Sequence, residues 1–173
     1  TDELQDRQLV PVILNLKGDF DWNHAVNLIL QYQVDGVIVA SSTVDTAFLE
    51  MVHAANVHLI QAFGRYTGDR SIDSVFVDNT GGGRRAAQEL LARGYRAPGF
   101  IGVAPGVSTS QDRLAGFSEG LAQAGITPRV IRAAGYSHDA GLARVVDLFE
   151  AHPELDPVFC ADDLLGLGAL DGL

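Results

Sequence analysis

Short apolar segments alternate with amphipathic helical patterns along the whole chain, and this alternation restricts the fold more than any other feature of the sequence. The apolar segments are mostly continuous and rich in β-branched and aromatic residues, as in strands that are buried on both faces of a parallel sheet. Because strand and helix recur with short connections, we predict an α/β fold with parallel sheets. The predicted strands are Val10–Leu14, Val34–Ala40, Val57–Ala62, Ser74–Val77, Gly99–Val103, Arg129–Ala133 and Pro157–Ala161.

Helical patterns occupy most of the chain between these strands. Gly94 and Gly125 are expected just beyond two helix C-termini, and Ser137 is expected to cap a helix N-terminus. Thr109 and Asp112 have the spacing of a capping box for another helix. The predicted helices are Trp22–Tyr32, Thr46–Ala55, Gly82–Arg93, Gln111–Ala124, Asp139–Ala151 and Leu164–Leu173.

The alternation is interrupted by the polar, turn-rich interval Gly64–Ser71, which leads into a short strand with no helix between. Such an interval is typical of a boundary between two units of a fold. We therefore predict two α/β lobes that meet near Asp78–Gly83. The N-terminal lobe then comprises residues 1–78 and the C-terminal lobe residues 79–173.

The charge balance and the cysteine content exclude several classes of protein. The chain of 173 residues has 12 Lys and Arg against 22 Asp and Glu, and its net charge of −10 argues against a grip on a phosphate backbone by this part of the protein. Cys160 is the only cysteine, so no internal disulfide or cysteine-based zinc site can form. No apolar run approaches the roughly 18 residues of a membrane span, so no membrane partner is expected. Thr1–Gln8 reads as the end of a helix already under way, so we expect the chain to be cut at its N-terminus.

Motifs of nucleotide, metal and hydrolase chemistry are weak or absent. Gly81–Ala86 fits the dinucleotide fingerprint, but residues 96–108 lack the acidic residue that would hold the ribose, so no nucleotide cofactor is expected. The five histidines have no metal-ligand spacing, and Gly135–Asp139 assembles triad residue types without a nucleophile elbow. We expect no enzyme activity, no cofactor and no metal. A metal-dependent α/β enzyme that uses Asp162 and Asp163 is an alternative from another class.

Charged residues at two positions are candidates for ligand binding. Asp162 and Asp163 follow the last predicted strand, and ligands of open α/β sheets bind at the carboxyl ends of strands. Asp163 is expected to cap the next helix, which leaves Asp162 for a ligand or for solvent. Arg113 lies in the first turn of its helix, where the helix dipole disfavours a cation. It is therefore either a ligand-binding group or an exposed arginine paired with Asp112 or Glu119.

Further candidates lie at the same edge of the predicted sheets. Ser41 and Ser42 close one predicted strand, and Phe63 and Arg65 close the next. Tyr136 follows a strand of the second lobe and supplies an aromatic face at that edge. These residues are candidates by position only.

Four stretches of the sequence carry a resemblance to a known family. They are Val34–Ser42; Val77–Asn79 running into Gly82 and Ala86–Ala87; Arg113–Phe117; and Val158–Asp163 with Leu167–Leu170. Taken together, they resemble the effector-binding domain of the LacI/GalR family of bacterial transcription regulators, which has the periplasmic-binding-protein fold. They occur in the family's order and spacing, and the resemblance spans nearly the whole chain. The family's usual Asn-Asp at the last strand end is Asp162-Asp163 here, which removes an amide donor from that position.

The resemblance implies a two-lobed fold in which each lobe is a parallel sheet flanked by helices. It also implies that the family's opening strand, its last strands and its DNA-binding headpiece lie outside this sequence. Arg113 would then fork onto effector oxygens, Tyr136 would stack on a sugar ring or base, and Asp162 would accept hydrogen bonds from sugar hydroxyls. The effector-binding residues implied in this way are Arg113, Tyr136, Asp162, Ser41, Ser42 and Phe63.

The function implied by the resemblance is that of a cytoplasmic, homodimeric repressor. A small molecule, most commonly a sugar, would bind in the cleft between the lobes and change operator DNA binding through the absent headpiece. The alternative is a periplasmic sugar-binding protein of a transporter, which shares the fold but is secreted and has no headpiece.

Overall fold

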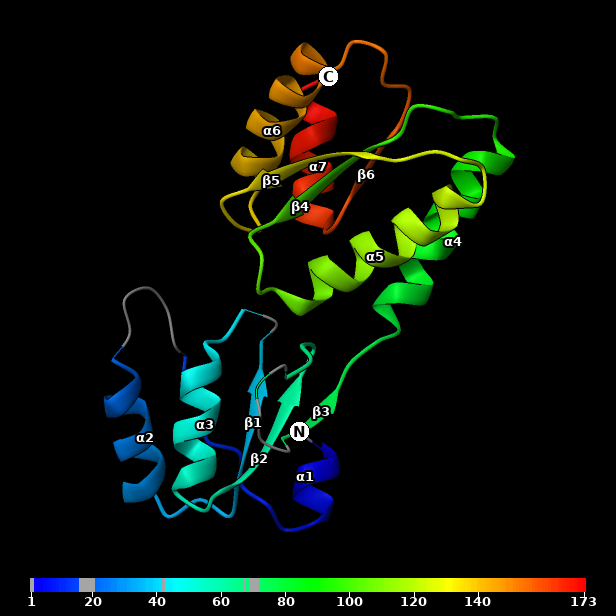
Figure 1. Cartoon of the computed structure of the whole chain (residues 1–173). Helices are drawn as coiled ribbons and strands as arrows, with labels where there is room; N and C mark the ends of the chain where they lie inside the picture. Colours follow the sequence, from blue (N-terminus) through cyan, green and yellow to red (C-terminus); the bar gives the residue numbers. More distant parts are fainter. Residues whose placement is uncertain (1, 16–20, 42, 67, 69–71) are drawn as a thin grey trace.

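The computed structural model describes residues 2–15, 21–41, 43–66, 68 and 72–173. Within them the chain forms two separate parallel sheets of three strands each, in the orders β1-β2-β3 and β5-β4-β6. Each sheet carries its own helices, and the two α/β lobes lie one above the other in Figure 1. The predicted α/β class, with parallel sheets in two lobes, is confirmed.

The N-terminal lobe is built on the sheet β1-β2-β3, in which Ala40 pairs with Ala62 and Ala62 with Val75. Helices α2 and α3 cover one face of this sheet with a buried apolar core that includes Phe48, Leu49 and Val52. Trp22 closes the core at one end, with its ring 5.0 Å from that of Phe48. The elements are α1 (Asp2–Asp6), α2 (Trp22–Gln31), β1 (Gly36–Ala40), α3 (Thr46–Ala54), β2 (His58–Ala62) and β3 (Asp73–Val75).

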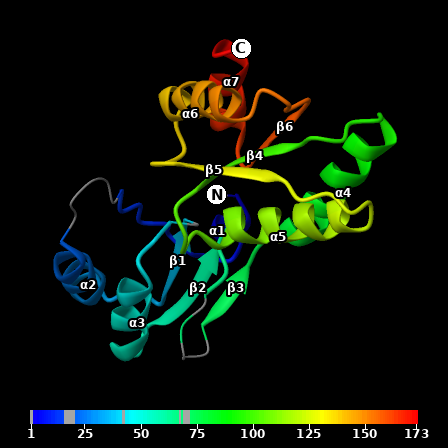
Figure 2. The ribbon, with the colours of Figure 1, turned by 45° about the horizontal axis from the view of Figure 1, so that its top comes forward.

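The C-terminal lobe has helices on both faces of the sheet β5-β4-β6, as Figure 2 shows: α6 and α7 lie on one side, α4 and α5 on the other. Strand β4 lies in the middle and is buried along its whole length. Phe100 points from it toward α4 and α5, whereas Ile101 and Val103 point toward α6 and α7. The elements are α4 (Asn79–Ala92), β4 (Gly99–Val103), α5 (Ser108–Ala122), β5 (Arg129–Ala133), α6 (His138–Ala151), β6 (Val158–Cys160) and α7 (Asp163–Asp171).

The predicted strand Val10–Leu14 is wrong, although all the other predicted strands and helices are present. Residues 9–15 are not helical, and no strand among the described residues pairs with them. A cavity of 540 Å³, lined by Val12–Asn15 on one side and by β1 on the other, separates this segment from the nearest sheet. Strands pair at about 4.8 Å, so the apolar pattern is present here without a partner to complete a ladder.

Most helix ends follow the sequence signals. Ser137 caps α6 by accepting a hydrogen bond from the Ala140 backbone N–H at 3.2 Å, and Gly94 and Gly125 adopt the positive φ expected beyond a helix C-terminus, at 91° and 71°. The capping box at Thr109 is wrong, because α5 begins at Ser108 and its N-cap, Val107, makes no side-chain hydrogen bond.

Glycines allow the helices of the C-terminal lobe to approach each other closely. A Cβ atom on Gly116 of α5 would lie 1.9 Å from the Thr80 carbonyl oxygen of α4, and one on Gly168 of α7 would lie 1.9 Å from the His138 carbonyl oxygen of α6. No side chain fits at such distances. Both helix pairs therefore pack backbone against backbone, which fixes how their N-terminal ends are placed at the sheet edge.

A histidine links α6 to α7 at the surface, and we expect a pH-dependent contribution to stability from it. His138 Nε2 lies 2.9 Å from Asp171 Oδ2, and Asp139 lies at 3.5 Å from the other ring nitrogen. Hydrogen bonding to Asp171, and then to Asp139, raises the pKa of His138 above its ordinary value. A raised folded-state pKa stabilises the fold fully below the unfolded-state pKa of about 6.5, and the gain is lost as pH rises through the folded-state pKa.

Urea unfolding at pH 6 and pH 8 tests this expectation. His138→Gln should lower the midpoint more at pH 6 than at pH 8, because the stabilisation by the charged ring is lost as pH rises through the folded-state pKa. An equal decrease of the urea midpoint at both pH values would contradict this expectation, because it would show that the ring stabilises the fold by packing and not by its charge.

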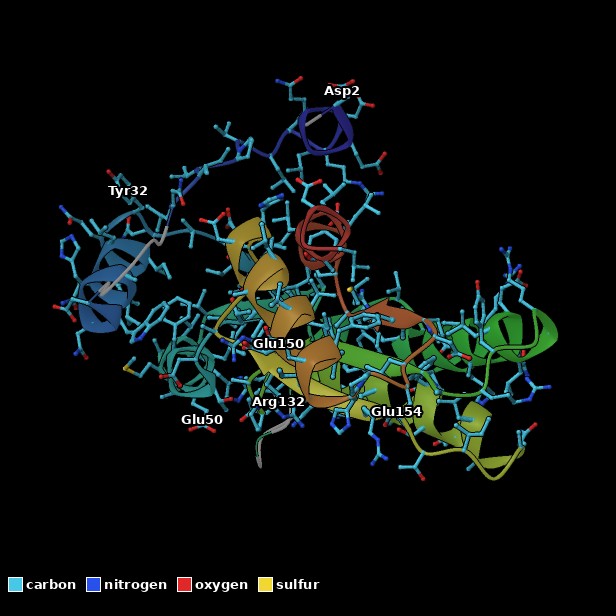
Figure 3. All side chains as sticks on the ribbon, turned by 90° about the horizontal axis from the view of Figure 1, so that it is seen from above. Asp2, Tyr32, Glu50, Arg132, Glu150 and Glu154 are labelled. Atoms are coloured by element: carbon cyan, nitrogen blue, oxygen red, sulfur yellow. The ribbon has the colours of Figure 1, made fainter. Side chains whose placement is uncertain are left out.

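The described surface fits the acidic composition. Glu150 and Glu154, at the end of α6 and in the loop beyond it, are exposed (Figure 3). Among the described residues, no helix is long and apolar enough to cross a bilayer.

Candidate functional site

The predicted site residues follow the carboxyl ends of strands in both lobes. Ser41 and Phe63 come directly after β1 and β2, Tyr136 and Asp162 follow β5 and β6, and Arg113 lies on α5. Figure 1 places the N-terminal end of α5 above the upper ends of β1 and β2, and the view in Figure 2 agrees. The strand-end edges of the two lobes therefore face each other, and ligands of open α/β folds bind at such edges.

Arg113 is half-buried and is held by neutral acceptors. Its Nε donates to Asn79 Oδ1 at 2.9 Å, and its Nη1 donates to the carbonyl oxygen of Ala161 at the end of β6. The predicted alternative, a pair with Asp112 or Glu119, is wrong. Those carboxylates bind Arg65 and Arg84 instead, at 2.8 Å and 2.7 Å.

Arg113 therefore keeps binding capacity for a ligand. Within the described part of the chain no carboxylate lies within 4 Å of its guanidinium group. The Nη2 group makes none of the hydrogen bonds found for this side chain, which leaves two N–H donors of the planar fork available.

A cavity of 430 Å³ brings Arg113 together with Asp162. Asp78 and Asn79 line it from the start of α4, and Cys160 lines it from β6. The cavity combines one guanidinium group with carboxylate and amide side chains, a donor and acceptor set that suits hydroxyl-rich or carboxylate-bearing small molecules.

The roles predicted for Asp162 and Asp163 are reversed in the structure. Asp162 is the residue that caps α7, since its Oδ1 accepts a hydrogen bond from the Leu164 backbone N–H at 2.9 Å. Asp163 is the first residue of the helix and is exposed. The extended backbone of Asp162 is the conformation that an N-cap needs, and its Oδ2 is left for another partner.

Tyr136 is half-buried against the apolar core beneath α6 and α7. Its hydroxyl lies 3.2 Å from Thr109 Oγ1, which ties the end of β5 to the first turn of α5. This hydrogen bond fixes the ring beside the helix that carries Arg113. Thr109 was not predicted as a neighbour of the site, because its spacing from Asp112 indicated a capping box instead.

In the N-terminal lobe, Phe63 presents an aromatic side chain to solvent in an unusual conformation. The side chain is 65% exposed, and the backbone φ is +69°, a left-handed value that bulky residues rarely adopt. The Phe63 N–H donates to Val75 O at 2.9 Å, which holds this conformation at the strand end. Backbone strain of this kind gathers at ligand sites.

Ser41 is tied into the turn after β1. Its Oγ lies 3.2 Å from Thr43 Oγ1, and its carbonyl accepts a hydrogen bond from Gln61 Nε2 at 3.3 Å. Ser42 lies outside the described residues. Ser41 lines the cavity beside β1 rather than the one around Arg113, and Tyr136 and Phe63 line neither. The cavity therefore unites Arg113 and Asp162, whereas the other predicted site residues stay predictions by position.

Asn79 and Ser108 are polar residues of this region that were not among the predicted candidates, and Arg65 was a candidate by position only. Asn79 is only 5% exposed and is the acceptor that orients Arg113. Its signal was present in the sequence, since it follows Asp78 directly at the end of a strand run. Arg65 and Ser108 carry no sequence signal for the contact that they make with each other across the lobes.

The thiol of Cys160 lines the cavity around Arg113 but is not activated. Burial raises the pKa of the Cys160 thiol to about 11, so the thiol is protonated at neutral pH and is a poor nucleophile or metal ligand. In the part of the chain that the structure describes, no three His, Cys, Asp or Glu side chains are grouped as a metal site would require.

Comparisons with known proteins agree on one family. The family described as periplasmic binding proteins and sugar binding domain of LacI family matches residues 2–173. The chain is 33% identical over 141 residues to the HTH-type transcriptional regulator CelR of Thermobifida fusca, which covers 79% of the chain and 41% of CelR. It is 27% identical over 184 residues to the ribose import binding protein RbsB of Bacillus subtilis, which covers 99% of the chain and 57% of RbsB.

A solved structure of a CelR–cellobiose complex superimposes with a TM-score of 0.86 at 27% identity, covering 98% of this chain and 53% of that one. The chain thus spans about half of the length of the proteins that it matches. The family match extends over both lobes and includes the cavity around Arg113. This chain belongs to the family of periplasmic binding proteins and sugar-binding domains of LacI regulators.

Proposed function

We propose that this chain is the effector-binding and dimerisation part of a LacI-type bacterial transcriptional repressor. A sugar binds between the lobes and changes how a DNA-binding headpiece elsewhere in the protein holds its operator. The observation that carries this proposal is the guanidinium group of Arg113. This group is half-buried at a cavity beside the strand ends. It has no carboxylate partner among the described residues, and its Nη2 donors remain available for a ligand.

The proposed contacts divide between the two lobes, whose boundary lies between residues 78 and 79. From the C-terminal lobe, Arg113 donates to two effector oxygens and Asp162 accepts from a hydroxyl group, while Tyr136 packs on the sugar ring. From the N-terminal lobe, Phe63 supplies a second apolar face, and the hydroxyl groups of Ser41 and Ser42 supply hydrogen bonds. A ligand bound to both lobes favours the arrangement in which both sets of residues reach it.

The relatives support a sugar as the effector. A CelR structure contains cellobiose, and CelR is more similar in sequence to this chain than RbsB is. We therefore propose cellobiose, a disaccharide of glucose, as the first ligand to test. The same comparison favours a cytoplasmic regulator over a transport receptor, and a binding protein over an enzyme.

An exposed stripe of leucines on α7 supports a homodimer. Leu164, Leu167 and Leu170 recur at every third residue and are 45%, 55% and 70% exposed. Residues at this spacing share one face of a helix, and contiguous exposed apolar surface marks a protein contact. A second copy of the chain is the partner that we propose for this face.

Operator binding by the full-length protein tests the proposal. We expect fluorescence anisotropy to detect binding to DNA from upstream of the protein's own gene, and we expect saturating cellobiose to change that affinity by about tenfold or more, the range of ordinary allosteric coupling. Glucose serves as the control ligand. A full-length protein that binds no such DNA and carries a cleaved export signal would make RbsB-like transport the correct function.

A further inference from the structure

Three hydrogen bonds from one residue of the N-terminal lobe reach the first turns of α5. The Arg65 backbone N–H donates to Ser108 Oγ at 2.9 Å. Two nitrogens of its side chain donate hydrogen bonds to Asp112, from Nη2 to Oδ1 at 2.8 Å and from Nε to Oδ2 at 3.4 Å. The fork of a guanidinium group on both oxygens of a carboxylate is the strongest geometry for such a pair.

These contacts join parts of the chain that are otherwise held together loosely. Arg65 follows β2, whereas Ser108 and Asp112 belong to α5, 43 and 47 residues further on. Among the described elements, no helix or strand of one lobe packs broadly on an element of the other. Among the described residues, the lobes are therefore connected by the chain between β3 and α4 and by the contacts of Arg65 with the start of α5.

The ion pair between Arg65 and Asp112 is partly shielded from solvent. The Asp112 side chain is 18% exposed and that of Arg65 is 43% exposed. Hydrogen bonding to Asp112 raises the pKa of Arg65 above its ordinary value, so this guanidinium group stays charged throughout the neutral range.

We propose that Arg65, Ser108 and Asp112 form a clasp that holds the two lobes together in the absence of effector. A partly exposed ion pair adds little to the stability of a fold. Two arrangements of a pair of lobes, however, differ by only a few kcal/mol, so a bidentate pair that exists in one arrangement shifts their populations several-fold.

The clasp also preorganises the binding site, an inference that rests on the proposed function. Arg65 lies two residues beyond Phe63, and Asp112 is adjacent to Arg113. Holding Arg65 against Asp112 brings the proposed ligand groups of the two lobes toward each other before ligand arrives. The apparent affinity for a ligand is proportional to the fraction of molecules whose lobes are in the arrangement that binds it.

Hydrogen exchange of the Arg65 backbone amide, followed by NMR without ligand, tests the clasp directly. Asp112→Asn removes the ion pair but leaves the hydrogen bond from this amide to Ser108 untouched. If the lobes open more often, the Arg65 amide should exchange several-fold faster, up to about fivefold. Glu119→Gln is the matched control, because it breaks an ion pair of 2.7 Å from the same helix that lies within the C-terminal lobe.

A double substitution shows whether the two side chains act as one unit. After correction for intrinsic exchange rates, Arg65→Gln together with Asp112→Asn should speed exchange no more than Asp112→Asn alone. An unchanged rate in Asp112→Asn, an equal increase in Glu119→Gln, or a double effect equal to the product of the single effects would each overturn the clasp.

A cellobiose titration of the same variants keeps the two proposals apart. If cellobiose binds the unmodified chain, Asp112→Asn should weaken binding about as much as it speeds exchange, and full affinity in this variant would contradict preorganisation. If cellobiose does not bind at all, the proposed effector is wrong, and the exchange rates alone decide on the clasp.

Discussion

Replacing Arg113 by alanine is expected to lower affinity for the effector by about a hundredfold or more. Two hydrogen bonds from a guanidinium group to ligand oxygens are worth about 1.5–3 kcal/mol each, and a factor of ten corresponds to about 1.4 kcal/mol. Isothermal titration calorimetry with cellobiose, or with whichever sugar binds the unmodified chain, measures the loss.

The same substitution is expected to cost stability, because Arg113 also serves the fold. Its removal leaves Asn79 Oδ1, on a side chain that is only 5% exposed, and the Ala161 carbonyl oxygen without their donor. An unsatisfied buried acceptor costs about 1–3 kcal/mol. Differential scanning calorimetry should show a lower Tm but one cooperative transition.

Two control variants separate charge from geometry in this experiment. Arg113→Lys keeps the charge but cannot fork, and it should lie between the native protein and the alanine variant. Arg84→Ala removes an arginine that is paired with Glu119 at 2.7 Å on the neighbouring helix, and affinity should be unchanged. Native affinity in Arg113→Ala would remove this residue from the site.

Among the described glycines, Gly116→Ala should give one of the largest losses of stability that a single added methyl group can cause. The new Cβ would lie 1.9 Å from the Thr80 carbonyl oxygen and 2.7 Å from its carbon, so α4 and α5 must move apart. Overpacking against rigid backbone costs about 3 kcal/mol or more. For a chain of this size, that loss lowers Tm by roughly 6–12 °C.

Gly82→Ala is the matched control, since Gly82 is also in a helix of this pair and a Cβ there would meet nothing within 4 Å. Alanine restricts the unfolded chain more than glycine does, so this variant should be as stable as the native protein or more stable by up to about 1 kcal/mol. Equal Tm values for the two alanine variants would show that α4 and α5 do not cross as closely as the structure has them.

These two predictions explain why Arg113–Phe117 (RLAGF) could be recognised in the sequence. Each conspicuous residue in it has a separate physical task. Arg113 bridges α4 and β6 beside the cavity, Gly116 permits the backbone approach to α4, and Phe117 packs at 6.1 Å from Phe100 in the core. A motif with three such tasks tolerates little change, which makes it easier to recognise than the rest of the helix.

Strands β4 and β5 were predicted with the bounds that the structure has, whereas the helix ends of the C-terminal lobe were predicted to within three residues. Strand β4 was predictable because both of its faces are buried and its apolar run is continuous. Val10–Leu14 has the same kind of pattern but no partner strand. Apolar patterning reports which residues avoid water, whereas a strand also needs a neighbour at hydrogen-bonding distance. Pattern alone could not distinguish the two cases.

The candidate site was predictable in its location and less so in its contacts. Strand ends gave the positions of Asp162 and Phe63, since the carboxyl edge of a parallel sheet is known once the strands are known. The exchange of roles between Asp162 and Asp163 came from a helix that starts one residue earlier than predicted. The contact of Arg65 with Asp112 spans 47 residues and depends on how the lobes meet, which no local pattern encodes.

The most direct test of effector binding between the lobes is an NMR titration of the ¹⁵N-labelled chain with cellobiose, with maltose and ribose as comparison ligands. We expect saturable shifts for one sugar at the amides of Arg113, Tyr136, Asp162 and Phe63, with the Arg113 side-chain Nε–H signal moving most. Saturable binding whose shifts lie elsewhere, for example at the cavity beside β1, would contradict the cleft between the lobes as the site.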